Sequence, residues 1–283
     1  MTDVVIIRPI SDSWEGEKYK RSITVPHGPL TLSAHLVDKG FSVEILDEIA
    51  LEPGETERRL ENSLKNKNPL CIGITSMTGE QIKRGKNFAS LARKFNPNIP
   101  IVWGGAHPTI LPKMTLEDQH VDIVCNGEGD VSFPLLVTEM KKNGTGDFSK
   151  VPGIYYTDKD GQIKQNPPPP LYDMNLMPDI PYELINMEKY ITSIKKKYIT
   201  RYFEINTSRG CPFKCTFCSN SKEGAPYTKM DAKRIVKEIV TLKKKYDVDG
   251  LTFNDENFLM NKRRFEAIAK AIIAKDLKLH IRS

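Results

Sequence analysis

Three cysteines in the last third of the chain are close enough together to hold a metal centre. Cys211, Cys215 and Cys218 are spaced C-x3-C-x2-C and are three of the five cysteines in the chain. Thiolates at such short spacing usually ligate a soft metal centre. Three thiolates are one fewer than the four that close a structural zinc site or an electron-transfer cluster, and the next histidine along the chain is His280. A 4Fe–4S cluster at this motif would keep one iron open to another ligand. Catalytic metal sites need such an open position, whereas structural sites avoid it.

Two other interpretations of the motif are a zinc knuckle and an ordinary cluster whose fourth ligand lies elsewhere in the chain. The spacing, with the aromatic Phe217 directly before the third cysteine, resembles the signature of the radical S-adenosylmethionine (SAM) enzymes. In that family the amino and carboxylate groups of SAM bind the open iron, and one-electron reduction cleaves SAM to a 5′-deoxyadenosyl radical. The resemblance implies that the three cysteines bind a 4Fe–4S cluster and that Phe217 packs near the adenine. Ordinary core packing is the alternative for Phe217.

Composition limits the classes of protein to which the chain can belong. Its 283 residues have room for about two domains, and 39% hydrophobic with 28% charged residues is the balance of a soluble globular protein. No apolar run approaches the length of a membrane span, and the first residues lead directly into an apolar segment without a signal peptide, so we expect a cytoplasmic protein. The net charge of +6 is mild and no RNA-binding motif is present. The lysine triplets 195–197 and 243–245 are typical of solvent-exposed surfaces, so we expect no nucleic-acid partner.

The two remaining cysteines have a different setting. Cys71 and Cys125 each lie inside an apolar run, where cysteine is usually a small buried core residue. The cysteine pattern therefore implies no disulfide framework.

The first half of the chain alternates between apolar runs rich in β-branched residues and amphipathic segments. Strands are expected at residues 4–7, 42–46, 70–75, 99–103 and 121–125, and helices at residues 30–40, 55–65, 80–95 and 130–141, the last capped by Asp130. This alternation predicts an α/β fold with a flavodoxin-like, doubly wound parallel sheet and helices on both faces.

Polar and glycine-rich segments follow three of the expected strands. They are residues 75–79, 104–109 and 127–130. Ligands of such sheets bind beyond the carboxyl ends of the strands, and glycines there let the backbone come close to a ligand. Each segment taken alone is also compatible with ordinary turn chemistry.

Taken together with the cysteine motif, these segments resemble the cobalamin-binding domain that precedes the catalytic barrel in the cobalamin-dependent (class B) radical SAM enzymes. The matching pieces are Pro-His-Gly-Pro-Leu at 26–30, Gly-Gly-x-His-Pro-Thr at 104–109 and Gly-Glu-Gly-Asp at 127–130. The resemblance implies that the nucleotide tail and corrin of cobalamin are lined by Thr75, Ser76, Gly104, Gly105, His107, Gly127, Glu128 and Gly129.

One motif of other cobalamin proteins is missing. Asp-x-His-x-x-Gly supplies a lower axial histidine in those proteins, whereas Asp118-Gln119-His120 is only a half-match, with Ile123 in place of the glycine. We therefore expect cobalamin to bind here without that histidine ligand. His107 is equally compatible with a ligand-lining role and with capping or packing.

The second half begins with an expected hairpin at residues 151–163, followed by four consecutive prolines at 167–170 that predict a stiff linker. Strands at 202–206, 250–253 and 277–281 alternate with helices at 232–246 and 262–275. Asp231 is expected to cap the first of these helices. This pattern predicts part of a TIM-type (β/α) barrel, with the cysteines after its first strand at the carboxyl face, where barrel chemistry takes place. The expected domains are 1–145 (cobalamin-binding), 146–195 (hairpin and linker) and 196–283 (first part of the radical SAM barrel).

Two acids stand at the end of the second barrel strand. Asp255 and Glu256 lie on the same face as the cysteines, and a carboxylate there can accept hydrogen bonds from the ammonium group of SAM. The resemblance implies that role for this strand end. The alternative is a pair of acids favoured by the dipole at a helix N-terminus.

The chain ends after only three barrel strands, so we expect it to be a truncated piece of a longer enzyme. The function implied by the resemblance is reductive cleavage of SAM for methyl transfer to an unactivated carbon. The alternatives are a radical cyclase or rearrangement without methyl transfer, and a non-catalytic corrinoid-binding or redox module. The expected partners are an unidentified small-molecule or peptide substrate and a low-potential electron donor such as flavodoxin or ferredoxin.

Overall fold

A computed structural model of the chain describes residues 2–10, 23–144, 147–195, 199–218 and 226–282. Lys196 and Lys197 of the first lysine triplet lie outside the described residues. The chain forms two compact units. The first contains Gly28–Pro170 and Ile180–Ile185 with the described N-terminal residues, and the second contains Asn186–Ser283, Leu171–Asp179 and Ile23–His27.

The first unit is built on a seven-stranded sheet of order β2-β1-β3-β4-β5-β6-β7. Its first five strands are parallel: β1 (Val4–Arg8), β2 (Val43–Asp47), β3 (Cys71–Thr75), β4 (Ile101–Gly104) and β5 (Ile123–Cys125). These strands are short runs of mostly β-branched residues, which suit a sheet covered on both faces. The order 2-1-3-4-5 is the flavodoxin-like, doubly wound topology, so the predicted fold class of the first unit is confirmed.

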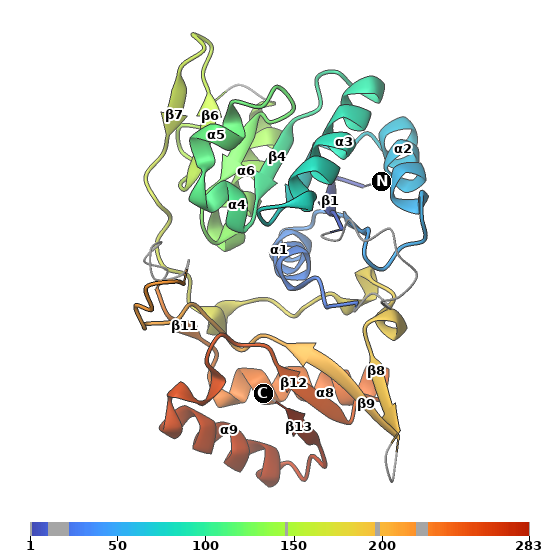
Figure 1. Cartoon of the computed structure of the whole chain (residues 1–283), viewed down its shortest axis with the longest axis vertical. Helices are drawn as coiled ribbons and strands as arrows, with labels where there is room; N and C mark the ends of the chain where they lie inside the picture. Colours follow the sequence, from blue (N-terminus) through green and yellow to red (C-terminus); the bar gives the residue numbers. More distant parts are fainter. Residues whose placement is uncertain (1, 11–22, 145–146, 196–198, 219–225, 283) are drawn as a thin grey trace. The chain divides into compact units, whose positions relative to one another are not determined.

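Four helices cover the two faces of this sheet: α1 (His27–Asp38), α2 (Glu55–Asn66), α3 (Glu80–Phe95) and α6 (Gly129–Asn143). The pleat of β1 divides its side chains between the two cores. Val4 and Ile6 pack in the core that contains Phe133 of α6 and Leu36 of α1. Val5 and Ile7 pack in the opposite core, which contains Leu60 of α2 and Phe88 of α3. The two helices of this second core lie side by side (Figure 1).

The connection from β4 to β5 contains two short helices that the sequence pattern did not indicate. They are α4 (Ala106–Ile110) and α5 (Pro112–Leu116), and the latter begins with a proline, whose fixed φ suits the first turn of a helix.

The prediction that Asp130 caps α6 is wrong. Glu128 occupies the cap position and makes no side-chain cap bond, while Asp130 lies within the first turn. The Asp130 carboxylate oxygen Oδ1 instead lies 3.0 Å from Nε2 of His35 on α1, and both side chains are buried. Asp130 therefore interacts with His35 on another helix and does not cap its own helix.

The expected hairpin is present as β6 (Ile154–Thr157) and β7 (Ile163–Gln165). We predicted it as part of the connecting segment, but β6 pairs antiparallel with β5 and so extends the first sheet. The hairpin buries Ile154 in the same core as Phe133, because the sheet edge at β5 offered unpaired backbone groups.

The second unit contains a four-stranded sheet of order β13-β12-β9-β8. Its strands are β8 (Thr192–Lys195), β9 (Ile199–Ile205), β12 (Gly250–Phe253) and β13 (His280–Arg282). The last three are mutually parallel, as the predicted barrel requires, whereas β8 is an antiparallel addition that we did not expect. The helices α8 (Ala232–Tyr246) and α9 (Lys262–Ala274) pack against each other (Figure 1).

Short elements complete the second half of the chain: the two-residue strands β10 (Ser208–Arg209) and β11 (Thr228–Lys229), and the 3-10 helices η1 (Met174–Leu176), η2 (Tyr182–Leu184), η3 (Met187–Lys189) and η4 (Phe258–Met260). The predicted cap of α8 is confirmed, because the side chain of Asp231 accepts a hydrogen bond of 2.8 Å from the amide of Arg234. Among the described residues, no helix is long and apolar enough to cross a membrane.

Candidate cofactor sites

The three clustered cysteines lie on a loop that leaves the carboxyl end of β9. Strand β9 ends at Ile205, the short strand β10 follows, and Gly210 with a φ of +71° then turns the chain into Cys211. Cys215 is exposed, Cys211 and Cys218 are half-buried, and the Cys218 amide donates a 3.0 Å hydrogen bond to the Cys215 carbonyl. Because the carboxyl ends of barrel strands carry the chemistry in this architecture, the thiols stand where a cofactor is expected.

Within the described residues, no group of three His, Cys, Asp or Glu side chains is placed to hold a metal ion, so the three thiols are not gathered into a cage. Such cages rarely exist before the metal binds, because ligand ordering and metal binding are coupled. The donor set nevertheless fits an iron–sulfur cluster, since three accessible thiols within eight residues are soft ligands.

The two remaining cysteines are excluded as ligands by their burial. Cys71 and Cys125 are both buried in the first core. Burial raises the pKa of Cys125 to about 12 and that of Cys71 still further, so neither forms the thiolate that binds metals. Their predicted role as core residues is confirmed.

The two acids at the end of β12 have different surroundings. The side chain of Asp255 is 0% exposed, and its carboxylate accepts hydrogen bonds from the amides and hydroxyls of Thr207 and Ser208. Glu256 is exposed. Phe217, on the cysteine loop, is 90% exposed and has not been drawn into a core. The roles of these three residues toward SAM stay predictions.

Sequence reasoning missed three residues beside this loop. Thr207 and Ser208 are buried, and Arg264 on α9 is buried and donates to the carbonyl of Thr207 at 2.8 Å. An arginine inside the amphipathic pattern of α9 looks like a surface residue in the sequence. The one signal in the sequence is spacing. Arg264 precedes Ile268 and Ile272 at intervals of one helical turn, so it lies on the same face of α9 as these two buried residues.

In the first unit, the loops after β3 and β4 are held together directly. The Ser76 amide donates to the Gly104 carbonyl at 2.9 Å, and the His107 amide donates to the Ser76 carbonyl at 3.0 Å. The ring nitrogen Nδ1 of His107 lies 3.1 Å from the hydroxyl of Thr78. His107 is 4% exposed, and burial lowers its pKa, so the ring is neutral near pH 7. Packing between the loops is therefore one role that His107 has.

Gly105 is the point at which these loops come closest. Its φ is +94°, and a Cβ atom there would lie 2.7 Å from the hydroxyl oxygen of Thr75 and 2.9 Å from the carbonyl oxygen of Ser76. Only glycine fits this position, because both the backbone conformation and the space exclude a side chain. Gly104 is different, since the atoms nearest to an added Cβ are 3.9 Å away.

The loop after β5 joins the same group through Thr109 of α4. The Gly127 amide donates to the Thr109 hydroxyl at 3.1 Å, and the side-chain amide of Asn126 donates to the Thr109 carbonyl at 2.9 Å. Gly127 and Glu128 are exposed, and a Cβ at Gly129 would come within 2.8 Å of Leu32. The structure thus brings the three predicted loops together at the carboxyl ends of β3, β4 and β5.

One buried hydroxyl in these loops, Oγ of Ser76 after β3, has no hydrogen-bond partner among the described residues. A buried polar atom without a partner is costly, and a ligand with amide and phosphate groups would satisfy it. The residues present therefore fit the polar periphery of cobalamin.

The half-matched histidine motif has a structural partner instead. Oδ1 of Asp118 lies 3.0 Å from Nδ1 of His120, and Oδ2 lies 2.6 Å from Nζ of Lys86. Burial alone would raise the pKa of Asp118, but its hydrogen bonds with Lys86 and His120 lower it below its ordinary value. His120 is thus engaged by the carboxylate next to it.

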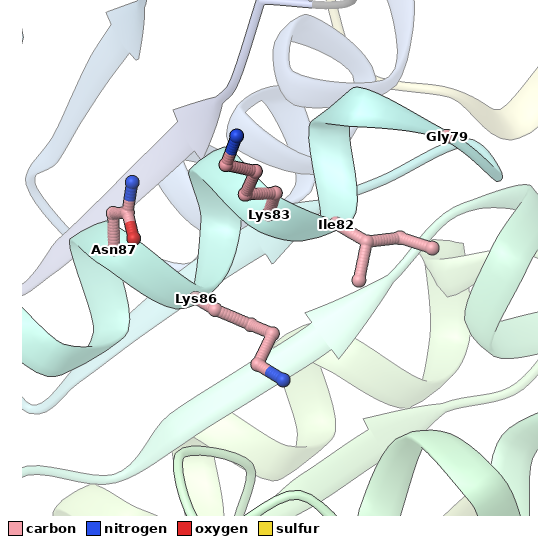
Figure 2. A pocket seen from close by; sticks show the side chains of 5 residues that line it. All are labelled: Gly79, Ile82, Lys83, Lys86 and Asn87. Carbon is pink, nitrogen blue, oxygen red and sulfur yellow. The ribbon is translucent and has the colours of Figure 1, made fainter.

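Two hollows lie along α3. One, of about 200 Å³, lies between α3 and α5 and is lined by Ile82, Lys86, Trp103, His107, Met114, Thr115, Asp118 and Val121. It is smaller than the usual volume of ligand pockets. The other is a shallow hollow on the outer surface of α3, where Lys83 and Asn87 project from a different side of the helix from Lys86 (Figure 2). Each hollow takes only one residue from the loops described above, Gly79 in the outer hollow and His107 in the other.

Comparison with known proteins gives two family matches. A family model described as "B12 binding domain" matches residues 21–137, and one described as "Radical SAM superfamily" matches residues 205–283. The first range contains the three glycine-rich loops, and the second contains the cysteine loop and both acids.

Curated relatives match across most of the chain. It is 29% identical over 266 residues to an uncharacterized methyltransferase of Pyrococcus horikoshii, covering 92% of this chain and 55% of the relative. It is 30% identical over 250 residues to the anaerobic magnesium-protoporphyrin IX monomethyl ester cyclase of Rubrivivax gelatinosus, covering 87% of this chain and 44% of the relative. The chain thus spans about half the length of these curated relatives.

A solved structure shares the fold over nearly the whole chain. The cobalamin-dependent SAM radical enzyme OxsB, with aqua-cobalamin and SAM bound, aligns with a TM-score of 0.77 at 19% identity, covering 99% of this chain and 38% of the OxsB chain. At this identity the similarity establishes the architecture, and it confirms the predicted pairing of a doubly wound domain with part of a radical SAM barrel.

Proposed function

Because the chain belongs to the cobalamin-dependent radical SAM family, we propose that it forms the cofactor-binding part of an enzyme that cleaves SAM reductively and transfers a methyl group to an unactivated carbon. The observation that carries the proposal is the loop of three accessible thiols at the carboxyl end of β9. The methyltransferases among the relatives favour methyl transfer.

When bound, a 4Fe–4S cluster supplies the electron that cleaves SAM, and cobalamin supplies the methyl group. Cys211, Cys215 and Cys218 would hold the cluster through their thiolates. Glu256, which is exposed at the end of β12, would accept hydrogen bonds from the ammonium group of SAM, and Phe217 would pack against the adenine. Both side chains have the freedom for these roles, because neither is committed to the core.

In the first unit, the loops after β3, β4 and β5 would surround cobalamin. Ser76 would donate its buried hydroxyl to the nucleotide tail, and Gly104 and Gly127 would let the backbone come close to the corrin. Because His107 and His120 are engaged by Thr78 and Asp118, we propose that neither binds cobalt. We assign residues 1–165 to this domain, since β6 and β7 extend its sheet.

A second function is favoured by one observation. Three cyclases that act on magnesium-protoporphyrin IX monomethyl ester are among the relatives, at 27–30% identity. A radical cyclisation would use the same cluster and SAM contacts without methyl transfer. The substrate in either case is a small molecule or peptide, and the electron donor is a low-potential protein such as flavodoxin or ferredoxin. We place the protein in the cytoplasm, where its accessible thiols stay reduced.

The test is anaerobic reconstitution with iron and sulfide, followed by reduction in the presence of SAM. We expect about four irons per chain and the appearance of 5′-deoxyadenosine. The triple variant of Cys211, Cys215 and Cys218 to Ala should incorporate no iron, whereas Cys71→Ala should incorporate as much as the original chain. Stoichiometric zinc with no iron uptake would show that the site is a zinc knuckle.

The cobalamin part has its own test. The electron paramagnetic resonance spectrum of bound cob(II)alamin should lack nitrogen superhyperfine splitting, because no histidine ligates cobalt. Clear nitrogen splitting that disappears in His107→Gln or His120→Gln would identify the ligand and overturn this part of the proposal.

A further inference from the structure

The loop that carries the three cysteines is held at both ends by one buried network. On the entering side, the Asp255 carboxylate accepts from the Thr207 amide at 2.6 Å and from the Ser208 amide at 3.1 Å. It also accepts from the Thr207 hydroxyl at 2.7 Å and the Ser208 hydroxyl at 2.6 Å. These residues come directly before Arg209-Gly210-Cys211. The carboxylate at the end of β12 therefore fixes the base of the loop.

Arg264 joins the leaving side of the loop to the same point. Its guanidinium donates to the carbonyl of Thr207 at 2.8 Å through Nη2 and to the carbonyl of Met230 at 3.3 Å through Nε. Nη1 lies 3.5 Å from Oδ2 of Asp255. The Met230 amide also donates to the Thr207 carbonyl at 2.9 Å, and β10 pairs with β11 just inside this contact. Both stems of the loop thus converge on a single ion pair.

The side chains of this network are buried, and the acceptor positions of the Asp255 carboxylate are occupied. The side chains of Arg264 and Asp255 are 5% and 0% exposed, and the guanidinium carbon lies 5.6 Å from the ring centre of Phe258. A carboxylate offers about four acceptor positions, and Asp255 uses four for Thr207 and Ser208 alone. No position is left for an incoming ammonium group unless the base of the loop is released.

We propose that Asp255 and Arg264 are positioning residues that set the geometry of the cluster loop, and that Asp255 is not a contact for SAM. The inference rests on the proposed function, because the loop is taken to hold the cluster. It divides the roles of two adjacent acids: Asp255 binds the backbone that leads to Cys211, and Glu256 is exposed.

The direct test is amide hydrogen exchange of the complete chain without iron. In Asp255→Ala, the amides of Thr207 and Ser208 should exchange about 10- to 100-fold faster, because each loses a hydrogen bond to a charged group. The Met230 amide, which donates to the Thr207 carbonyl, should also exchange faster because the base of the loop is released. Asp249→Ala is the matched control. Oδ1 of Asp249 accepts from the Arg201 amide at 2.6 Å at the opposite end of β9, so its loss should accelerate Arg201 and leave the loop stems unchanged. Equal exchange of the stems in Asp255→Ala and the original chain would overturn the proposal.

If Asp255→Ala does not fold, Asp255→Asn carries the test, because an amide keeps the volume but loses the charge that pairs with Arg264. The expected acceleration at Ser208 is then about tenfold. Unchanged exchange in this folded variant would overturn the proposal.

A second readout separates positioning from SAM contact. In reconstituted protein, Glu256→Gln should weaken SAM binding about tenfold, measured by the change that SAM makes in the spectrum of the reduced cluster. Asp255→Asn should keep the SAM affinity per cluster within about twofold, while the spectrum without SAM is altered and iron content falls. A loss of SAM affinity in Asp255→Asn equal to that in Glu256→Gln, with exchange unchanged, would make Asp255 a SAM contact. If the original chain binds no iron, the proposed function fails, yet amide exchange still decides whether the network holds the loop.

Discussion

Replacing Gly105 and Gly104 separately by Ala tests how the cobalamin-side loops are built. The two glycines are adjacent at the end of β4, and both were predicted to line the same ligand. Their surroundings differ: Gly105 has a φ of +94° and a ψ of −170°, whereas Gly104 is the last residue of the strand. We expect one substitution to destabilise the first unit and the other to be tolerated.

The magnitude for Gly105→Ala follows from two contributions. A non-glycine residue in this backbone region costs about 1–3 kcal/mol. The added Cβ, at 2.7 Å from the Thr75 hydroxyl and 2.9 Å from the Ser76 carbonyl, adds an overpacking cost of about 1–3 kcal/mol. The Ser76 carbonyl cannot move away freely, because it accepts from the His107 amide. The total loss is about 2–6 kcal/mol.

For Gly104→Ala the same reasoning predicts the opposite sign. Its added Cβ meets no atom closer than 3.9 Å, and its φ is not positive. An Ala in a compatible conformation stabilises a protein by about 0.4–1 kcal/mol, because it restricts the unfolded chain. The unfolding free energies of the two variants should therefore differ by about 2–7 kcal/mol.

The assay is urea unfolding of the complete chain, followed by tryptophan fluorescence. Trp103 is one of two tryptophans and is 1% exposed in β4, directly before the two glycines. A Trp14→Phe background leaves its emission as the only signal. Unfolding free energies of Gly105→Ala and the background that agree within about 0.5 kcal/mol would refute the argument from Gly105. A loss in Gly104→Ala as large as that in Gly105→Ala would refute the distinction between them.

Two further predictions concern buried titratable groups. Burial lowers the pKa of His107 below its ordinary value of 6.5, so as the pH falls the unfolded chain binds this proton before the folded chain does. The stability that His107 contributes is complete above the unfolded pKa of about 6.5 and is lost as the pH falls from there through the lowered pKa of the folded chain. His107→Gln should therefore weaken the pH dependence of the unfolding free energy between about pH 7 and pH 5, and an unchanged slope would contradict the assignment. Because burial raises the pKa of Cys125 to about 12, anaerobic alkylation of the folded chain near pH 8 should modify Cys215 readily and spare Cys125 and Cys71 until the chain unfolds. Mass spectrometry of the alkylated peptides decides this, and equal labelling of Cys125 and Cys215 would show that the first core is open.

Much of the fold could be predicted because it depends on local patterns. The helix at 80–95 and the strand at 250–253 have the predicted bounds, since an amphipathic period and a short apolar run are both contained within the segment itself. The cap at Asp231 was also local, because its acceptor and the Arg234 amide are three residues apart. The cysteine spacing identified the candidate cluster for the same reason.

Two of the errors involve partners far away in the sequence. Asp130 looked like a helix cap, but its partner is His35, which is 95 residues away. The hairpin was predicted correctly, yet only the open edge of β5 made it part of the first sheet. Strand β8 was also not expected, although its partner β9 is near in the sequence, with Lys195 opposite Ile199.

The sequence by itself determined which residues could bind cofactors: three clustered thiols, glycine-rich segments after apolar runs, and two adjacent acids. Only the tertiary structure distinguished Asp255 from Glu256, and Gly105 from Gly104. Asp255 is held by Thr207 and Ser208, which are 48 and 47 residues away, and Gly105 faces the loop that follows another strand. The physical reason is that residue type and spacing set the chemistry a segment offers. Which atoms a side chain finally meets depends on how parallel strands align, and that alignment is decided by the packing of the whole sheet.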